Sequence, residues 1–93
     1  MDGARFNSGR FNIHDLRLVN SLLRDGFDAR RCDFGCTLRI ASGRQSIHLT
    51  CMYDYPRAMR VFTIEETNES FGVLPNAVHR AVELAGRAWA PIS

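Results

Sequence analysis

Apolar and polar residues alternate along a central stretch of the sequence, which is broken once by a glycine-containing turn. A strand whose side chains alternate with this two-residue period typically has one buried face. The turn, Ser42-Gly43-Arg44, is short, as hairpin turns commonly are. The sequence therefore predicts an antiparallel hairpin at the centre of the chain. Its apolar residues are Cys36, Leu38 and Ile40 before the turn and Ile47, Leu49 and Cys51 after it.

Two further segments are candidates for strands beside this hairpin. Residues 58–65 are rich in β-branched and aromatic side chains, but both of their faces are apolar, so either face can be the buried one. Residues 27–32 have a weaker alternation that is compatible with a short first strand. Residues 66–71 are polar and acidic, and we expect a loop there. The pattern predicts an antiparallel meander of three or four strands.

A first helix is predicted before the meander. Asn12 is a favourable N-cap, and Asp15 stands at the third helical position, where a carboxylate can bond back to the cap. We expect Gly26 to end the helix in a left-handed conformation, with Phe27 packing back on the last turn. The apolar stripe at helical period consists of Ile13, Leu16, Val19, Leu22 and Leu23.

A second helix is predicted after the meander. Pro75 suits its first turn, and Pro91 marks its end. Small residues widen its apolar stripe, which favours close packing of the helix on the sheet. The stripe consists of Val78, Val82, Ala85 and Trp89, widened by Ala77, Ala81, Leu84 and Ala88.

This order of elements predicts an α+β fold with two layers: a helix, an antiparallel meander of three or four strands, and a helix, with both helices packed on one sheet face. The chain has 93 residues, which fits one domain. We expect residues 1–10 to form a flexible lead-in and residues 11–90 a single α+β domain. The sheet face away from the helices is then expected to carry Thr37, Arg39, His48, Thr50 and Met52.

Charge and hydropathy limit the classes of function. All twelve basic residues are arginine, yet the net charge is only +2, which falls short of the concentrated positive surface of a dedicated nucleic-acid binder. No apolar run approaches the roughly 20 residues of a membrane span. The N-terminus lacks the apolar segment of a secretory signal. We therefore expect a cytoplasmic protein without a membrane partner.

Three cysteines and one histidine are candidates for a metal or catalytic site. Cys32, Cys36, His48 and Cys51 are ligand types of structural zinc, but they contain no Cys-x-x-Cys pair, and strand phase places His48 opposite Cys36 and Cys51. Cys32 follows two arginines that favour a thiolate, but no base accompanies it. An odd cysteine count argues against a disulfide framework. We predict no metal, no cofactor and no enzymatic activity.

The order helix, strands, helix between residues 12 and 89 resembles that of double-stranded RNA-binding domains. That family has a lysine-rich cluster at the start of its second helix, whereas residues 75–80 here carry only Arg80. Tyr53 and Tyr55 provide stacking platforms beside arginines of the sheet. An RNA- or DNA-binding domain with an arginine-rich sheet face is therefore the alternative hypothesis. Its arginines are Arg30, Arg31, Arg39, Arg44, Arg57 and Arg60.

The segment from Tyr53 to Arg57 is predicted to be a loop with the composition of a protein interface, since tyrosine and arginine dominate binding hot spots. The alternative is that both tyrosine rings fold back over the edge of the core. We predict a small protein-binding module that occupies a partner protein as an inhibitor, adaptor or chaperone-type regulator, of bacterial or phage origin, with a homodimer as a further possibility. The predicted binding residues are Tyr53, Asp54, Tyr55, Arg57, Arg39, His48, Thr50, Met52 and Arg60.

Overall fold

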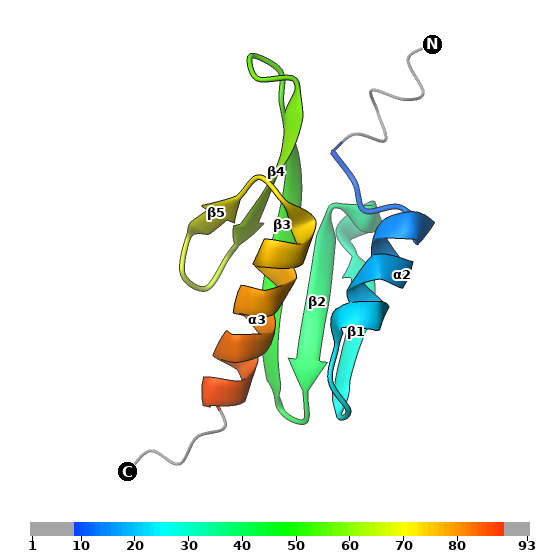
Figure 1. The fold of residues 1–93 in the computed structure, drawn as a ribbon, viewed down its shortest axis with the longest axis vertical. Helices are drawn as coiled ribbons and strands as arrows, with labels where there is room; N and C mark the ends of the chain where they lie inside the picture. The colour runs from blue at the N-terminus through cyan, green and yellow to red at the C-terminus, as the bar shows by residue number, and fades with distance from the viewer. Residues whose placement is uncertain (1–8, 89–93) are drawn as a thin grey trace.

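Five strands and two α-helices make up the part of the chain that the structure, a computed structural model, describes: residues 9–88 (Figure 1). Trp89, Pro91 and most of the predicted lead-in lie outside it. The strands are β1 (Phe27–Cys32), β2 (Thr37–Ser42), β3 (Gln45–Asp54), β4 (Met59–Ile64) and β5 (Glu69–Phe71). The helices are α2 (Ile13–Leu22) and α3 (Leu74–Ala88), and a 3₁₀ turn, η1 (Asp33–Gly35), joins β1 to β2.

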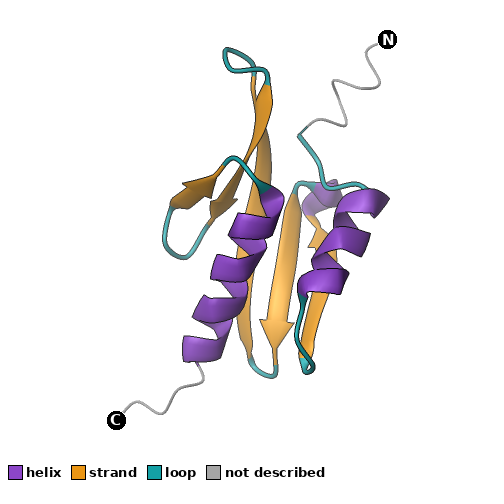
Figure 2. Ribbon diagram, in the orientation of Figure 1, coloured by secondary structure: helices purple, strands orange, loops and turns teal. Residues whose placement is uncertain are grey.

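The strands form one antiparallel sheet in chain order, β1-β2-β3-β4-β5, which is a meander. Both helices lie on the same side of it, with α3 across the middle strands and α2 beside it over β1 (Figure 2). The predicted α+β class with two layers is therefore confirmed. None of the helices described is long and apolar enough to cross a membrane.

The sheet has one strand more than the three or four predicted, because part of the expected loop 66–71 is the short strand β5. Its side chains are mostly polar, but Phe71 lies opposite Phe62 in the ladder and packs against the core. The packing of Phe71 on the core thus explains why this segment forms a strand, although its composition predicts a loop. The polar residue Ser70 lies opposite Thr63, and their hydroxyl oxygens are 3.0 Å apart.

The core lies between the helices and one face of the sheet. Alternate residues of β3 and β4 point into it, as predicted for the central hairpin. In β4 the buried residues are Phe62 and Ile64, while Val61 faces the other way, so packing decides which face of the predicted strand 58–65 is covered. We call the face away from the helices the open face. The large core residues are Phe11, Val19, Leu38, Ile40, Ile47, Leu49, Phe62, Ile64, Val78 and Val82.

Helix α2 begins as predicted and ends earlier. The side chain of Asn12 accepts a hydrogen bond from the Asp15 N–H at 2.8 Å, and the Asn12 N–H donates to the Asp15 carboxylate at 2.9 Å, which completes a capping box. The helix stops at Leu22 because Leu23 is extended. Gly26, with a φ of 90°, instead serves a turn in which the Phe27 N–H donates to the Arg24 carbonyl.

Helix α3 packs closely on the sheet through small residues. Ala77, Ala81 and Ala85 are fully buried, and Val78 and Val82 lie beside them in the core. Small side chains let the helix backbone approach the strands closely, so the predicted reason for the broad small-residue face is confirmed.

Candidate functional site

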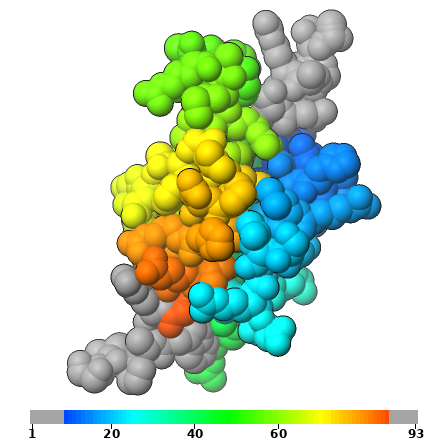
Figure 3. Space-filling view, in the orientation of Figure 1, coloured from blue at the N-terminus to red at the C-terminus, as the bar shows by residue number. Residues whose placement is uncertain are grey.

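The β3–β4 hairpin extends past the end of the other strands (Figure 1), and the space-filling view shows it as a projection at one end of the molecule (Figure 3). Tyr53 and Asp54 still belong to β3, where they lie opposite Arg60 and Met59. The prediction of a loop over Tyr53–Arg57 is therefore wrong for its first two residues. The proline that suggested a loop lies in the turn itself, where its missing N–H costs no ladder bond.

The turn is held by its own polar residues. The Asp54 carboxylate accepts a hydrogen bond from the Arg57 N–H and lies 3.4 Å from the Arg57 guanidinium. The Ala58 N–H donates to the Tyr55 carbonyl at 3.1 Å. Asp54 and Arg57, both predicted to bind a partner, are thus engaged with each other.

The two tyrosines at the tip differ in exposure. Their rings are 4.8 Å apart and meet edge to face, at 71°. Tyr53 is half-buried on the helix side, whereas Tyr55 is 62% exposed. The alternative that the tyrosine rings fold back over the edge of the core therefore fits Tyr53 better than Tyr55. Met52, on the open face, is 66% exposed. Large apolar groups therefore stand in solvent at the hairpin end.

Two hollows flank these side chains. The larger, about 400 Å³, lies between the turn and β4, and the smaller, about 340 Å³, lies on the side of Arg10 and Cys36. Both are lined by Met52, Tyr53 and Tyr55. The hairpin surface, as we use the term, consists of Met52, Tyr53, Tyr55, Pro56 and Val61.

The predicted residues of the open face lie together, but the polar side chains of His48 and Thr50 already have hydrogen-bond partners within the chain. Arg39 lies opposite His48 in the ladder. The His48 ring is 2.7 Å from the Glu66 carboxylate, and the Thr50 hydroxyl donates to the Thr63 carbonyl at 3.3 Å. Burial would raise the pKa of Glu66, but hydrogen bonds from the side chain and backbone of His48 hold it below its usual value.

Two residues near the start of β2 differ from their predicted exposure. Thr37, expected on the exposed sheet face, is buried, and its hydroxyl lies 3.4 Å from the Asp33 carboxylate of η1. Cys36, expected to face the core, is exposed because β2 begins only at Thr37. The 3₁₀ turn η1, which strand periodicity does not reveal, explains both differences.

Arg60 is not part of the same surface as Arg39 and His48. It has the strand phase of Phe62, so it lies on the helix side, with its guanidinium 5.1 Å from the Phe62 ring centre. Its two terminal nitrogens contact the two Asp15 carboxylate oxygens at 2.7 and 3.0 Å. The hydrogen bond to Asp15 raises the pKa of Arg60. The structure thus places Arg60 in a partly buried ion pair with the first helix.

Sequence reasoning missed an exposed aromatic residue in η1. Phe34 is 93% exposed, and its φ of 56° lies in the left-handed region that non-glycine residues rarely adopt. A hollow of about 740 Å³ lies beside it. A signal was present in the sequence, since a phenylalanine before Gly35 in a strand connection is unusual for a turn.

The cysteines do not come together with His48 as a metal site. The Cys51 N–H donates to the Cys36 carbonyl, whereas His48 is on the open face with Glu66. Within residues 9–88, no group of three or more potential metal ligands is found. Burial raises the pKa of Cys51 to about 11.

These environments predict the order in which the thiols react. We expect iodoacetamide at neutral pH to label Cys36 first, because it is exposed, and Cys51 only after unfolding, because its thiol is buried and protonated. Peptide mass spectrometry after timed quenching measures each site. Rapid labelling of Cys51 in the folded protein would contradict the packing of β3 described above.

The chain matches no protein-family model, no curated protein and no solved structure.

Proposed function

We propose that the chain is a non-enzymatic protein-binding module that contacts its partner through the hairpin surface. The observation that carries this proposal is the position of Met52 and Tyr55, which stand largely in solvent between two hollows. Clustered apolar and aromatic side chains beside pockets are typical of binding hot spots. Such a patch on a small domain is also typical of an interaction site.

Two contacts within the hairpin restrain its surface, and a surface restrained before binding lowers the entropic cost of binding. The ion pair between Asp54 and Arg57 closes the turn, and the edge-to-face contact fixes the ring of Tyr55 against Tyr53. These polar residues therefore support the surface from within.

The distribution of arginines supports protein over nucleic acid as the partner. Arg30 pairs with Asp28 on the open face, whereas Arg60 pairs with Asp15 on the helix side. Among the described residues, the strands direct no phenylalanine, tyrosine or tryptophan to the open face, and the His48 ring there already lies 2.7 Å from the Glu66 carboxylate. A nucleic-acid surface would combine gathered cations with stacking rings.

The role that fits such a module is occupation of another protein, as an inhibitor, adaptor or chaperone-type regulator. Our proposal includes a cytoplasmic location, where an exposed thiol such as that of Cys36 stays reduced. It also includes a bacterial or phage origin, since small regulators without catalytic residues are common there. A second copy of the chain is a further candidate partner.

Affinity capture from an extract of the native host tests the proposal. We expect the immobilised protein to retain a partner after nuclease treatment, and the double variant Met52→Ser with Tyr55→Ser to lose it, because the variant removes the exposed apolar groups at the hairpin. Quantitative mass spectrometry compares the two captures.

Leu18→Ser is the matched control, since Leu18 is an exposed apolar residue of α2. It should retain the partner as the parent protein does. Light scattering of the pure protein measures its mass and so tests whether a second copy of the chain is the partner. Equal retention by the hairpin variant, or loss of every partner with nuclease, would overturn the proposal.

A further inference from the structure

A groove of about 740 Å³ lies between the start of α2 and the turn η1. Its apolar wall consists of Phe34, 93% exposed, and Ile13, 48% exposed. Neither residue belongs to the hairpin surface, so this groove can be tested separately. Two large apolar groups in solvent at one hollow are unusual for a small domain.

Two arginines line the same groove. Arg10 and Arg31 are exposed along it, and none of the groove's described lining residues is acidic. No carboxylate of the described residues forms an ion pair with Arg10 or Arg31, whereas Asp15 below the groove is already paired with Arg60. The groove therefore carries positive charge that the described part of the chain leaves without a counter-charge.

Hydrogen bonding orients one of these arginines. The Arg31 guanidinium donates to the Phe11 carbonyl at 3.3 Å, and its remaining N–H groups are available for a ligand. The nearest acid of the turn, Asp33, lies 3.4 Å from the hydroxyl of Thr37, a residue of the open face. The Arg31 donors therefore favour an anionic ligand, and Asp33 is not among the residues that line the groove.

The backbone of η1 keeps the phenylalanine in solvent. Asp33, Phe34 and Gly35 all have positive φ values, of 51°, 56° and 91°. For the first two residues this conformation is strained. Glycine or asparagine at position 34 would relieve the strain, so an exposed aromatic ring there costs stability in the free chain.

We propose that this groove binds an acidic peptide segment of a partner protein, with one apolar side chain packed against Phe34 and Ile13 and flanking carboxylates paired with Arg10 and Arg31. Charge complementarity selects the acidic residues, and the exposed ring and aliphatic side chain select the apolar one. Arginine suits carboxylates because its planar N–H groups form paired hydrogen bonds. Because the aliphatic Ile13 lines the groove together with Phe34, the groove favours an apolar side chain over a stacked nucleic-acid base.

Fluorescence anisotropy with a short labelled peptide, in which glutamates flank a single phenylalanine, tests the proposal on the full chain. We expect saturable binding that weakens with added salt. Substituting Phe34→Gly or Arg31→Gln should weaken it at least about tenfold. Glutamine in place of the glutamates, or serine in place of the phenylalanine, should have the same effect.

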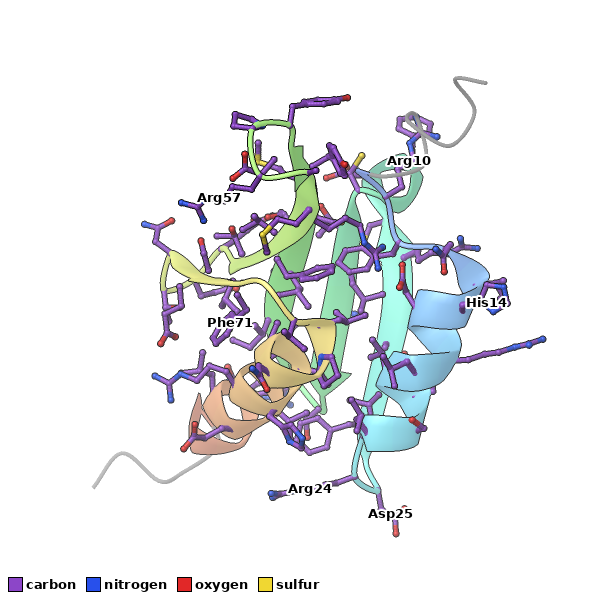
Figure 4. The ribbon with its side chains drawn as sticks, turned by 45° about the horizontal axis from the view of Figure 1, so that its top comes forward. Arg10, His14, Arg24, Asp25, Arg57 and Phe71 are labelled. Atoms are coloured by element: carbon purple, nitrogen blue, oxygen red, sulfur yellow. The ribbon has the colours of Figure 1, made fainter. Side chains whose placement is uncertain are left out.

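Two matched variants serve as controls. Arg24 lies at the opposite end from Arg10 (Figure 4), so Arg24→Gln should bind as the parent does, and so should Val73→Ser, which removes an exposed apolar group elsewhere. Unchanged binding by the Phe34→Gly and Arg31→Gln variants would overturn the proposal. So would tighter binding of a single-stranded oligonucleotide than of the peptide.

The thermal midpoint of Phe34→Gly gives a second, independent outcome. Glycine accepts the positive φ, so the midpoint should stay the same or rise. A clear fall would mean that the ring already packs against this chain, which would overturn the inference of a vacant groove.

Discussion

Replacing Asp15 by alanine is expected to lower the free energy of unfolding by about 3 kcal/mol, because it leaves the partly buried Arg60 without its counter-charge. Asp15 is 6% exposed and bonds both to Arg60 and to the Asn12 N–H. One substitution therefore removes an ion pair and half of a capping box. Urea unfolding followed by circular dichroism measures the change.

A double-mutant cycle separates the ion pair from the cap. We expect Arg60→Leu to cost a similar amount, and the double variant to lose at least about 1 kcal/mol less than the two single losses combined. Asp28→Ala is the matched control, because its pair with Arg30 is exposed and should contribute less than about 1 kcal/mol. Additive losses would show that Asp15 and Arg60 act independently.

The pH dependence of stability provides a second readout of the same pair. Burial would raise the pKa of Asp15, but hydrogen bonds from Arg60 and Asn12 and the charge of Arg60 hold it below the ordinary value of 3.8. The carboxylate thus stabilises the fold above that value, and the stabilisation is lost as the pH falls through the lower, folded-state pKa. The Asp15→Ala variant should lose stability less steeply in this acid range than the parent.

Leu49→Ala is expected to cost about 3 kcal/mol, because Leu49 is fully buried in the central strand between β2 and β4. For a domain of this size, total stability is of the order of 5–15 kcal/mol, so the loss is a large share. Denaturant unfolding should show a lower midpoint and an unchanged slope.

Thr50→Val is the control for this prediction, since Thr50 is the next residue of β3 and lies on the open face. We expect it to change stability by less than about 1 kcal/mol, because valine keeps the β-branched shape and the lost hydroxyl makes one long hydrogen bond, to the Thr63 carbonyl, among the described residues. A loss as large as that of Leu49→Ala would indicate that the open face is covered in solution.

Local patterns in the sequence predicted the helices and the central hairpin well. The capping box at Asn12 and Asp15 forms as expected, and the small residues of α3 are buried. These features depend on neighbours three or four positions away, so local sequence carries the necessary information. The end of α2 was predicted less well, because the extended conformation of Leu23 follows from packing on the core.

Residues distant in the sequence decided the features that local patterns missed. Strand β5 pairs because Phe71 reaches the core opposite Phe62, and the extension of β3 through Asp54 depends on its pairing with Met59. The side of the sheet on which Arg60 lies follows from the register of β4 with β3. The sequence did not decide this side, because both faces of residues 58–65 are apolar. Each of these outcomes is a choice between pairings that a single strand cannot make alone.

Local patterns in the sequence specify the alternating strands, the capped first helix and the close-packed last helix, and hence a sheet covered on one face. Tertiary contacts are needed to pair Arg60 with Asp15, to place Tyr55 and Met52 between two hollows and to place Phe34 beside a cationic groove. The difference arises because hydrophobic periodicity specifies which side of an element is buried. It does not specify which distant side chains meet at the ends of the strands, because that depends on register and on the path of the turns.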